Sequence, residues 1–224
     1  MTRKAELRVT EILPKGRFMK LLVLLLGMLV LSPLFEEFFK VRVLGDIFFT
    51  LILIYAAYSF SRSKALVAAA VSLAVPAIAS FWLKPFFSGQ WVEISGGICS
   101  MAFMAIIIAA ILRYIFLQQD VSADIIAGAI VAYLLMALMW SMLYDVLEAA
   151  HPGSFKFPEG ATQLRGEMSV YFSLVTITTV GYGDITPVTR VARAFANLEA
   201  VVGQLYLVIL VSWLVGMYVS ARSK

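Results

Sequence analysis

The sequence has 224 residues, of which 62% are apolar and 14% charged, and its mean hydropathy is +0.92. A soluble domain carries roughly 45–50% apolar and about 25% charged residues, so this composition excludes a water-soluble fold and predicts an integral membrane protein. The net charge of +4 does not come from an aromatic-interleaved basic patch, so no nucleic-acid partner is expected. With one cysteine, Cys99, and one histidine, His151, we expect no disulfide, metal cluster, imidazole triad or enzyme activity.

The chain begins with a basic segment followed by an apolar run. Residues 1–17 hold five basic and two acidic side chains and predict a short cytoplasmic tail at the lipid headgroups. The run over residues 18–35, ended by Pro33 and an acidic pair, predicts the first membrane span. A signal peptide is the alternative, but bulky Leu34 and Phe35 stand where a small-residue cleavage pattern is expected.

Two further spans are predicted before residue 84. The second, residues 44–60, is short, because 14 residues after Asp46 are uncharged and about 20 are expected for a crossing. Arg62 and Lys64 then mark a cytoplasmic turn. The third span, residues 65–83, is rich in alanine and serine, which favours close contact between helices.

The fourth predicted span, residues 94–116, bears on voltage sensing. A voltage sensor needs several basic residues at every third position, each contributing about 2.3 kcal/mol per 100 mV of field crossed. This span holds one basic residue, Arg113, at its end. Residues 18–116 therefore predict a four-helix membrane domain without a voltage-sensor array.

The second half of the chain predicts a pore domain over residues 124–220. A short connector leads to an outer helix at residues 125–147. Residues 148–166, with two prolines and His151, predict a loop exposed outside the membrane, and we interpret His151 as a solvated residue there rather than a pH sensor. No organic cofactor is expected, and no small-molecule ligand is identified.

The loop TTVGYGD occupies residues 178–184. Successive carbonyls point toward one axis only when alternate residues adopt left-handed φ/ψ values, which glycine adopts at low cost. Gly181 and Gly183 supply these alternations, so the carbonyls of residues 179–182 and the Thr179 hydroxyl would stack as rings of ligands for a dehydrated potassium ion. One chain gives a quarter of each ring, which predicts a cyclic homotetramer. The predicted ion-binding residues are Thr179, Val180, Gly181, Tyr182 and Gly183.

From about Tyr171 to Gly203 the sequence resembles the signature of the potassium-channel family. The resemblance implies an all-α, six-span subunit with a re-entrant pore helix at residues 167–178, a filter at residues 179–183 and a tetrameric pore. The alternative is an ordinary glycine turn between two helices. A non-conducting regulatory subunit would carry the same sequence, although the intact filter argues against it.

Three residues are expected to support the filter: Thr178, Asp184 and Tyr171. Many family members carry a tryptophan pair on the pore helix, and an indole nitrogen of that pair bonds the carboxylate after the filter. The matching residues here are Tyr171 and Phe172, and phenylalanine has no donor. Val175 also replaces a glutamate that some relatives place behind the filter. The resemblance therefore implies altered bracing of Asp184.

The last predicted span is an inner helix at residues 194–218. Polar groups inside a span usually face protein or water. We expect one face to line the pore, Glu199 to pack behind the filter, and Gly203 either to bend the helix or to pack closely against a neighbour. The pore-lining or gating candidates are Asn197, Glu199, Gly203, Gln204, Leu207 and Val211.

Basic residues set the expected orientation. With six spans and both termini in the cytoplasm, eleven of the 18 Lys and Arg residues lie inside, and the filter faces outward. The sequence thus predicts a multi-pass subunit of a cell-membrane potassium channel, in contact with lipid and with copies of itself. It conducts passively and is not steeply voltage-gated. Gating by lipid, tension, pH or the filter itself stays open.

Overall fold

The computed structural model describes residues 16–39, 89–118, 120–157 and 166–222, together with the isolated positions 47, 50, 51, 72, 75 and 79. Nearly all of the predicted tail (residues 1–17) and most of the predicted second and third spans (residues 44–60 and 65–83) lie outside the described residues. What was predicted for those segments stays a prediction.

The described chain is helical, with one short pair of strands. The helices are α2 (Arg17–Phe39), α5 (Gln90–Phe116), α6 (Ala123–Ala150), α7 (Glu167–Ile177) and α8 (Arg190–Arg222). The strands β1 (Phe155–Lys156) and β2 (Thr186–Pro187) pair antiparallel. Four of the described helices are long and apolar enough to span a membrane, namely α2, α5, α6 and α8. An all-helical membrane fold is therefore confirmed at this level.

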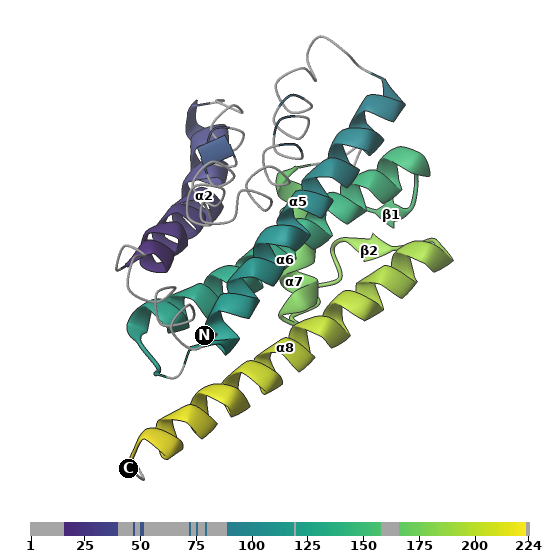
Figure 1. Cartoon of the computed structure of the whole chain (residues 1–224). Helices are drawn as coiled ribbons and strands as arrows, with labels where there is room; N and C mark the ends of the chain where they lie inside the picture. Colours follow the sequence, from purple (N-terminus) through teal and green to yellow (C-terminus); the bar gives the residue numbers. More distant parts are fainter. Residues whose placement is uncertain are drawn as a thin grey trace.

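Helix α6 is the centre of the fold, because α2, α5, α7 and α8 all pack against it (Figure 1). Helix α5 runs along α6 and buries a face whose members recur every three or four residues, as a 3.6-residue period requires. Within that contact Gly97 allows close approach, since a Cβ there would lie 2.4 Å from Val146 Cγ2. The face of α5 buried in this way includes Ser100, Phe103, Met104, Ile107, Ile111 and Ile115.

The candidate membrane span of α2, Arg17–Phe35, agrees with the predicted first span, but the helix itself is longer. We expected Pro33 to end it near residue 35, but α2 continues to Phe39 with Pro33 inside the helix. A proline removes one backbone hydrogen bond, to the carbonyl four residues earlier. The other bonds of the helix persist, and such a local loss is tolerated in membrane helices.

The inner helix also starts earlier than predicted, at Arg190 rather than residue 194. The physical reason is a cap: Thr189 Oγ1 accepts from Ala192 N at 3.3 Å, and its carbonyl accepts from Arg193 N at 3.0 Å. The prediction placed the boundary where the apolar run begins and missed the polar first turn. Helix α7 lies between α6 and α8 (Figure 1).

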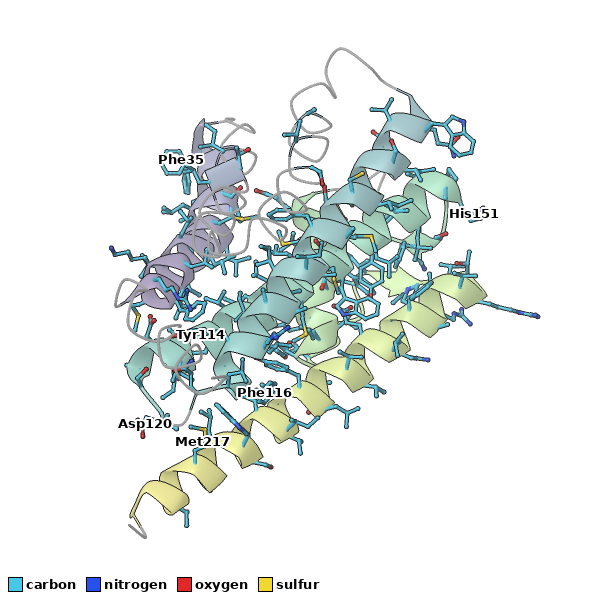
Figure 2. All side chains as sticks on the ribbon, viewed as in Figure 1. Phe35, Tyr114, Phe116, Asp120, His151 and Met217 are labelled. Carbon is cyan, nitrogen blue, oxygen red and sulfur yellow. The ribbon has the colours of Figure 1, made fainter. Side chains whose placement is uncertain are left out.

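The two ends of the bundle are clearly separated. Figure 2 places Asp120, Phe116 and Met217 together at one end and His151 at the other. At the end that holds Phe116, helices α5 and α8 are in contact through the edge-to-face pair of Phe116 and Trp213, whose ring centroids lie 5.2 Å apart. The loop after α6 and the connector before it are thus on opposite sides of the bundle.

A carboxylate from α6 caps α2. Asp124 Oδ1 accepts from Phe18 N at 3.0 Å and from Met19 N at 3.2 Å, and these two donors have no partner inside a first helical turn. Next to this cap, the Phe18 ring packs on Gly128, where a Cβ would lie 2.9 Å from the ring. The guanidinium of Arg17 lies 4.1 Å from the centroid of Tyr114. Helix α2 is therefore bonded directly to the start of α6.

Replacing Asp124 with alanine should weaken this junction. Loss of a helix cap costs about 1 kcal/mol, which for a chain of this size lowers the melting temperature by about 2–4 °C. Thermal unfolding of the purified protein in detergent measures the shift. Asp120→Ala is the matched control, since Asp120 is an exposed aspartate of the same connector. Equal melting temperatures for the two variants would contradict the role of Asp124.

Candidate ion-binding site

The loop after α7 has an alternating backbone. Thr179, Gly181 and Gly183 have φ values of +60°, +58° and +81°, and Thr179 is the one non-glycine residue with positive φ in the described chain. The glycine positions agree with the sequence argument. The positive φ of Thr179 was not predicted, because a β-branched residue rarely adopts this conformation. Such strain is typical of functional sites.

Backbone hydrogen bonds turn the loop in one direction. Thr179 N donates to Thr176 O at 2.9 Å, while Val180 N and Gly181 N both donate to Val175 O, at 2.9 and 3.3 Å. The N–H groups of residues 179–181 are thus hydrogen-bonded to carbonyl oxygens in the last turn of α7. Within the described residues of the chain, no backbone or side-chain donor reaches the carbonyl oxygens of residues 179–183. Those oxygens are available as ligands.

Two side chains of the loop are uncovered in the single chain. Val180 is 54% exposed and Tyr182 is 72% exposed. Both side chains lie beside the two glycines of the loop, Gly181 and Gly183.

Asp184, just beyond the loop, is braced from α7. Tyr171 Oη donates to Asp184 Oδ2 at 2.7 Å, and Ile185 N donates to Asp184 Oδ1 at 3.0 Å. The Tyr171 ring also stacks on Tyr182, with centroids 6.4 Å apart. The hydrogen bond from Tyr171 is the main cause that lowers the pKa of Asp184 below its ordinary value. The resemblance implied an altered brace, because Phe172 has no donor, and in the structure the donor is Tyr171, one residue earlier.

Tyr171→Phe should therefore change the acid response of the outer loop. A lowered pKa means that the brace contributes stability above the ordinary aspartate pKa and loses it as pH falls through the lowered value. Without the hydroxyl, the pKa of Asp184 should return toward its ordinary value, so the variant should be less stable than the wild type above that value, and the difference should shrink as pH falls through the lowered value of the wild type. Melting curves from about pH 3 to pH 6 measure this. Superimposable pH profiles for the two proteins would contradict the brace.

The segment after the loop is fixed to the end of α6. The strand pair joins Phe155 to Pro187, and Val188 N donates to Ser154 O at 2.8 Å. On the other side, the buried Glu148 carboxylate accepts from Gly153 N at 2.9 Å and from Phe155 N at 3.3 Å. The exit of the loop is therefore held by α6 through β1.

Helix α8 presents one face to its own chain and leaves the rest open. Four of the predicted pore-lining residues are exposed: Asn197, Gln204, Leu207 and Val211. Glu199 and Gly203 are buried instead, facing α6 and α7. A Cβ at Gly203 would lie 2.5 Å from Ile177 Cγ1 and 2.7 Å from the Ile177 carbonyl oxygen. The structure thus separates the predicted set into an open face and a packed face.

Polar contacts fasten α7 along one face, at positions four residues apart. Ser169 Oγ donates to Asp145 Oδ1, Ser173 contacts α6 and α8, and the Ile177 carbonyl accepts from Tyr133 Oη at 3.0 Å. The Tyr133 ring stacks on Tyr206 of α8. Sequence analysis missed these serine and tyrosine residues. The four-residue spacing of Ser169, Ser173 and Ile177 along α7 was a signal in the sequence. The residues that bond to them, however, lie 24 to 44 residues away in the chain.

The chain is similar to known proteins over part of its length. The family described as "Ion channel" matches residues 125–220, which hold α6, α7, the loop and α8. The chain is 40% identical over 67 residues to "Two pore potassium channel c" from Oryza sativa subsp. japonica, covering 30% of this chain and 14% of that protein. It is 35% identical over 78 residues to "Inward rectifier potassium channel Kirbac3.1" from Paramagnetospirillum magnetotacticum, covering 35% and 23%.

A third relative is "Protein LctB" from Bacillus caldotenax, 36% identical over 84 residues, which are 36% of this chain and 62% of that protein. The matched region is thus less than two thirds of the length of each of these relatives. No solved structure matches the chain significantly. Residues 125–220 thus match the ion-channel family, and part of the chain is similar to proteins named as potassium channels. Together with the apolar helices, this match indicates a multi-pass membrane protein.

Proposed function

We propose that the chain is one subunit of a homotetrameric, potassium-selective channel that passes potassium ions down their gradient. The observation that carries the proposal is the loop backbone, in which alternate residues have positive φ and the carbonyl oxygens of residues 179–183 receive no donor from the described residues. Rings of carbonyl oxygens replace the hydration shell of a potassium ion. The names of two relatives support potassium as the cargo.

The tetramer is proposed from what one chain lacks. One loop offers a single set of oxygens, whereas a dehydrated ion needs a full ring. The exposed side chains of Val180 and Tyr182 lie on the loop, and α8 leaves a long apolar surface open beside it. Four copies around the loop axis would close the rings and cover part of this surface. The remaining apolar helix surface would contact lipid.

The proposed channel does not gate steeply with voltage. Helix α5 is the described helix that precedes the pore domain, and its basic residue, Arg113, lies in the last turn. A single charge near the end of a helix crosses little of the field. In the proposed orientation both termini are cytoplasmic, Asp120 lies inside and His151 lies outside, in agreement with their opposite positions in Figure 2.

The test is potassium flux into liposomes that contain the purified chain alone. We expect uptake that is selective for potassium over sodium and blocked by barium, and a particle mass of four chains. Equal sodium and potassium uptake would refute the account of the filter. A tetramer without uptake would favour the regulatory-subunit alternative, and a monomer would refute the assembly.

A further inference from the structure

One buried carboxylate joins the three helices of the pore domain. Glu199 of α8 is 0% exposed. One of its oxygens, Oε2, accepts from Tyr144 Oη of α6, and the other, Oε1, lies within hydrogen-bond distance of Ser173 Oγ of α7. The titratable groups that face it from α6 are Tyr144 and, at longer range, Tyr133. The described part of α7 presents the Ser173 hydroxyl at this point.

The number of protons in this cluster does not fit an ionised carboxylate. Ser173 Oγ also lies 2.7 Å from the Ala137 carbonyl oxygen of α6. A serine hydroxyl has one proton to donate, whereas a carbonyl and an ionised carboxylate are both acceptors. If Ser173 donated to Glu199, its oxygen would meet the Ala137 oxygen with no proton between them. If it donated to Ala137, the same conflict would arise at Glu199.

We infer that Glu199 is a neutral carboxylic acid whose proton is donated to Ser173 Oγ, and that it positions the filter through the pore helix. All contacts are then satisfied: Tyr144 donates to Glu199 Oε2, Glu199 Oε1 donates to Ser173, and Ser173 donates to the Ala137 carbonyl. No charge is placed in the apolar interior, where an isolated charge is costly. This chain of hydrogen bonds links α6, α7 and α8.

The chain of hydrogen bonds ends close in sequence to a residue that bonds to the ion-binding loop. Ser173 lies two residues before Val175, whose carbonyl accepts the N–H groups of Val180 and Gly181. A change in the position of α7 at Ser173 therefore changes the position of the loop backbone. Glu199 does not touch the ion path in this arrangement, so it is a positioning residue for the proposed conduction, and the functional part of the inference rests on that proposal.

The first experiment measures the proton directly. Infrared spectra of the full chain in liposomes should contain the carbonyl stretch of a protonated carboxylic acid at neutral pH, and Glu199→Gln should remove it. Deuterium exchange should shift the band, because the proton is on oxygen. Absence of the band in the wild type, or its persistence in the variant, would overturn the inference. This measurement does not depend on whether the protein conducts.

The second experiment measures positioning. Glutamine presents an oxygen to Tyr144 and an N–H donor to Ser173, so Glu199→Gln should keep the wild-type preference for potassium over sodium in the flux assay. Glu199→Ala and Ser173→Ala break the chain of hydrogen bonds and should lower that preference on the order of tenfold. Ser141→Ala is the control, because this buried serine bonds inside its own helix, to Leu138 O at 2.8 Å.

The outcomes separate the inference from the proposed function. If the wild type is selective and the glutamine variant loses selectivity as alanine does, the positioning role of the neutral acid is wrong while the channel stands. If the alanine variants match Ser141→Ala, the chain of hydrogen bonds does not position the filter. If the wild type passes no potassium, the proposed function fails, and the infrared band still decides the protonation of Glu199.

Discussion

Replacing Gly203 with alanine is expected to destabilise the pore domain and remove its preference for potassium. A methyl group at Gly203 would come within 2.7 Å of the Ile177 carbonyl oxygen, which is backbone and cannot rotate away. Helix α8 would have to move from α7, and overpacking of this kind costs about 1–3 kcal/mol. The same carbonyl accepts from Tyr133, so the displacement would also strain the contact that ends α7. Thermal unfolding and ion flux measure the two effects.

Gly216→Ala is the matched control for this substitution. Gly216 lies on the same helix, and a Cβ there would meet nothing within 4 Å in the chain. Since alanine favours a helix over glycine by about 1 kcal/mol, this variant should be unchanged or slightly more stable. If Gly203→Ala behaved in the same way, close packing would not be its role. A stable, selective Gly203→Ala protein with fewer openings would instead support the bending role that the sequence left open.

The sequence predicted the parts of the site that depend on local backbone chemistry. Gly181 and Gly183 were identified because left-handed φ values are costly for other residues, and the structure has both in that region. Thr179 escaped the same reasoning, since its residue type gives no sign of a positive φ. The membrane helices were predicted from apolar runs, which mark their existence better than their ends. Thr189 and Pro33 show why: a cap extends one helix, and a tolerated proline extends another.

The sequence did not predict the contacts that hold the loop in place. Burial of Glu199 was expected, because a carboxylate within a span needs protein or water around it. Its partners were not, since Tyr144 and Ser173 are 55 and 26 residues away and nothing local selects them. Tyr171 was expected to support the filter, but the sequence did not pair it with Asp184, whereas the structure does. Side-chain pairs between helices depend on helix rotation, which the apolar pattern determines only coarsely.

Replacing Gly181 with alanine is expected to abolish discrimination between potassium and sodium. Gly181 has a φ of +58°, and its N–H donates to Val175 O, so both its conformation and its bond orient the loop. An L-residue in this region costs about 1–2 kcal/mol, and that cost is relieved if the backbone turns to negative φ. Turning would redirect a carbonyl away from the ion axis. Tracer uptake of each ion into liposomes measures the loss.

Gly153→Ala tests whether strain alone explains such a result. Gly153 has a φ of +86°, and, as at Gly181, a Cβ would meet nothing within 4 Å in the chain. The two substitutions therefore introduce the same kind of backbone strain, one in the loop after α6 and one in the filter. Both should lower the melting temperature, but Gly153→Ala should retain selective uptake. Equal loss of selectivity in the two variants would mean that general destabilisation is responsible, and the alternating backbone of residues 179–183 would no longer account for ion choice.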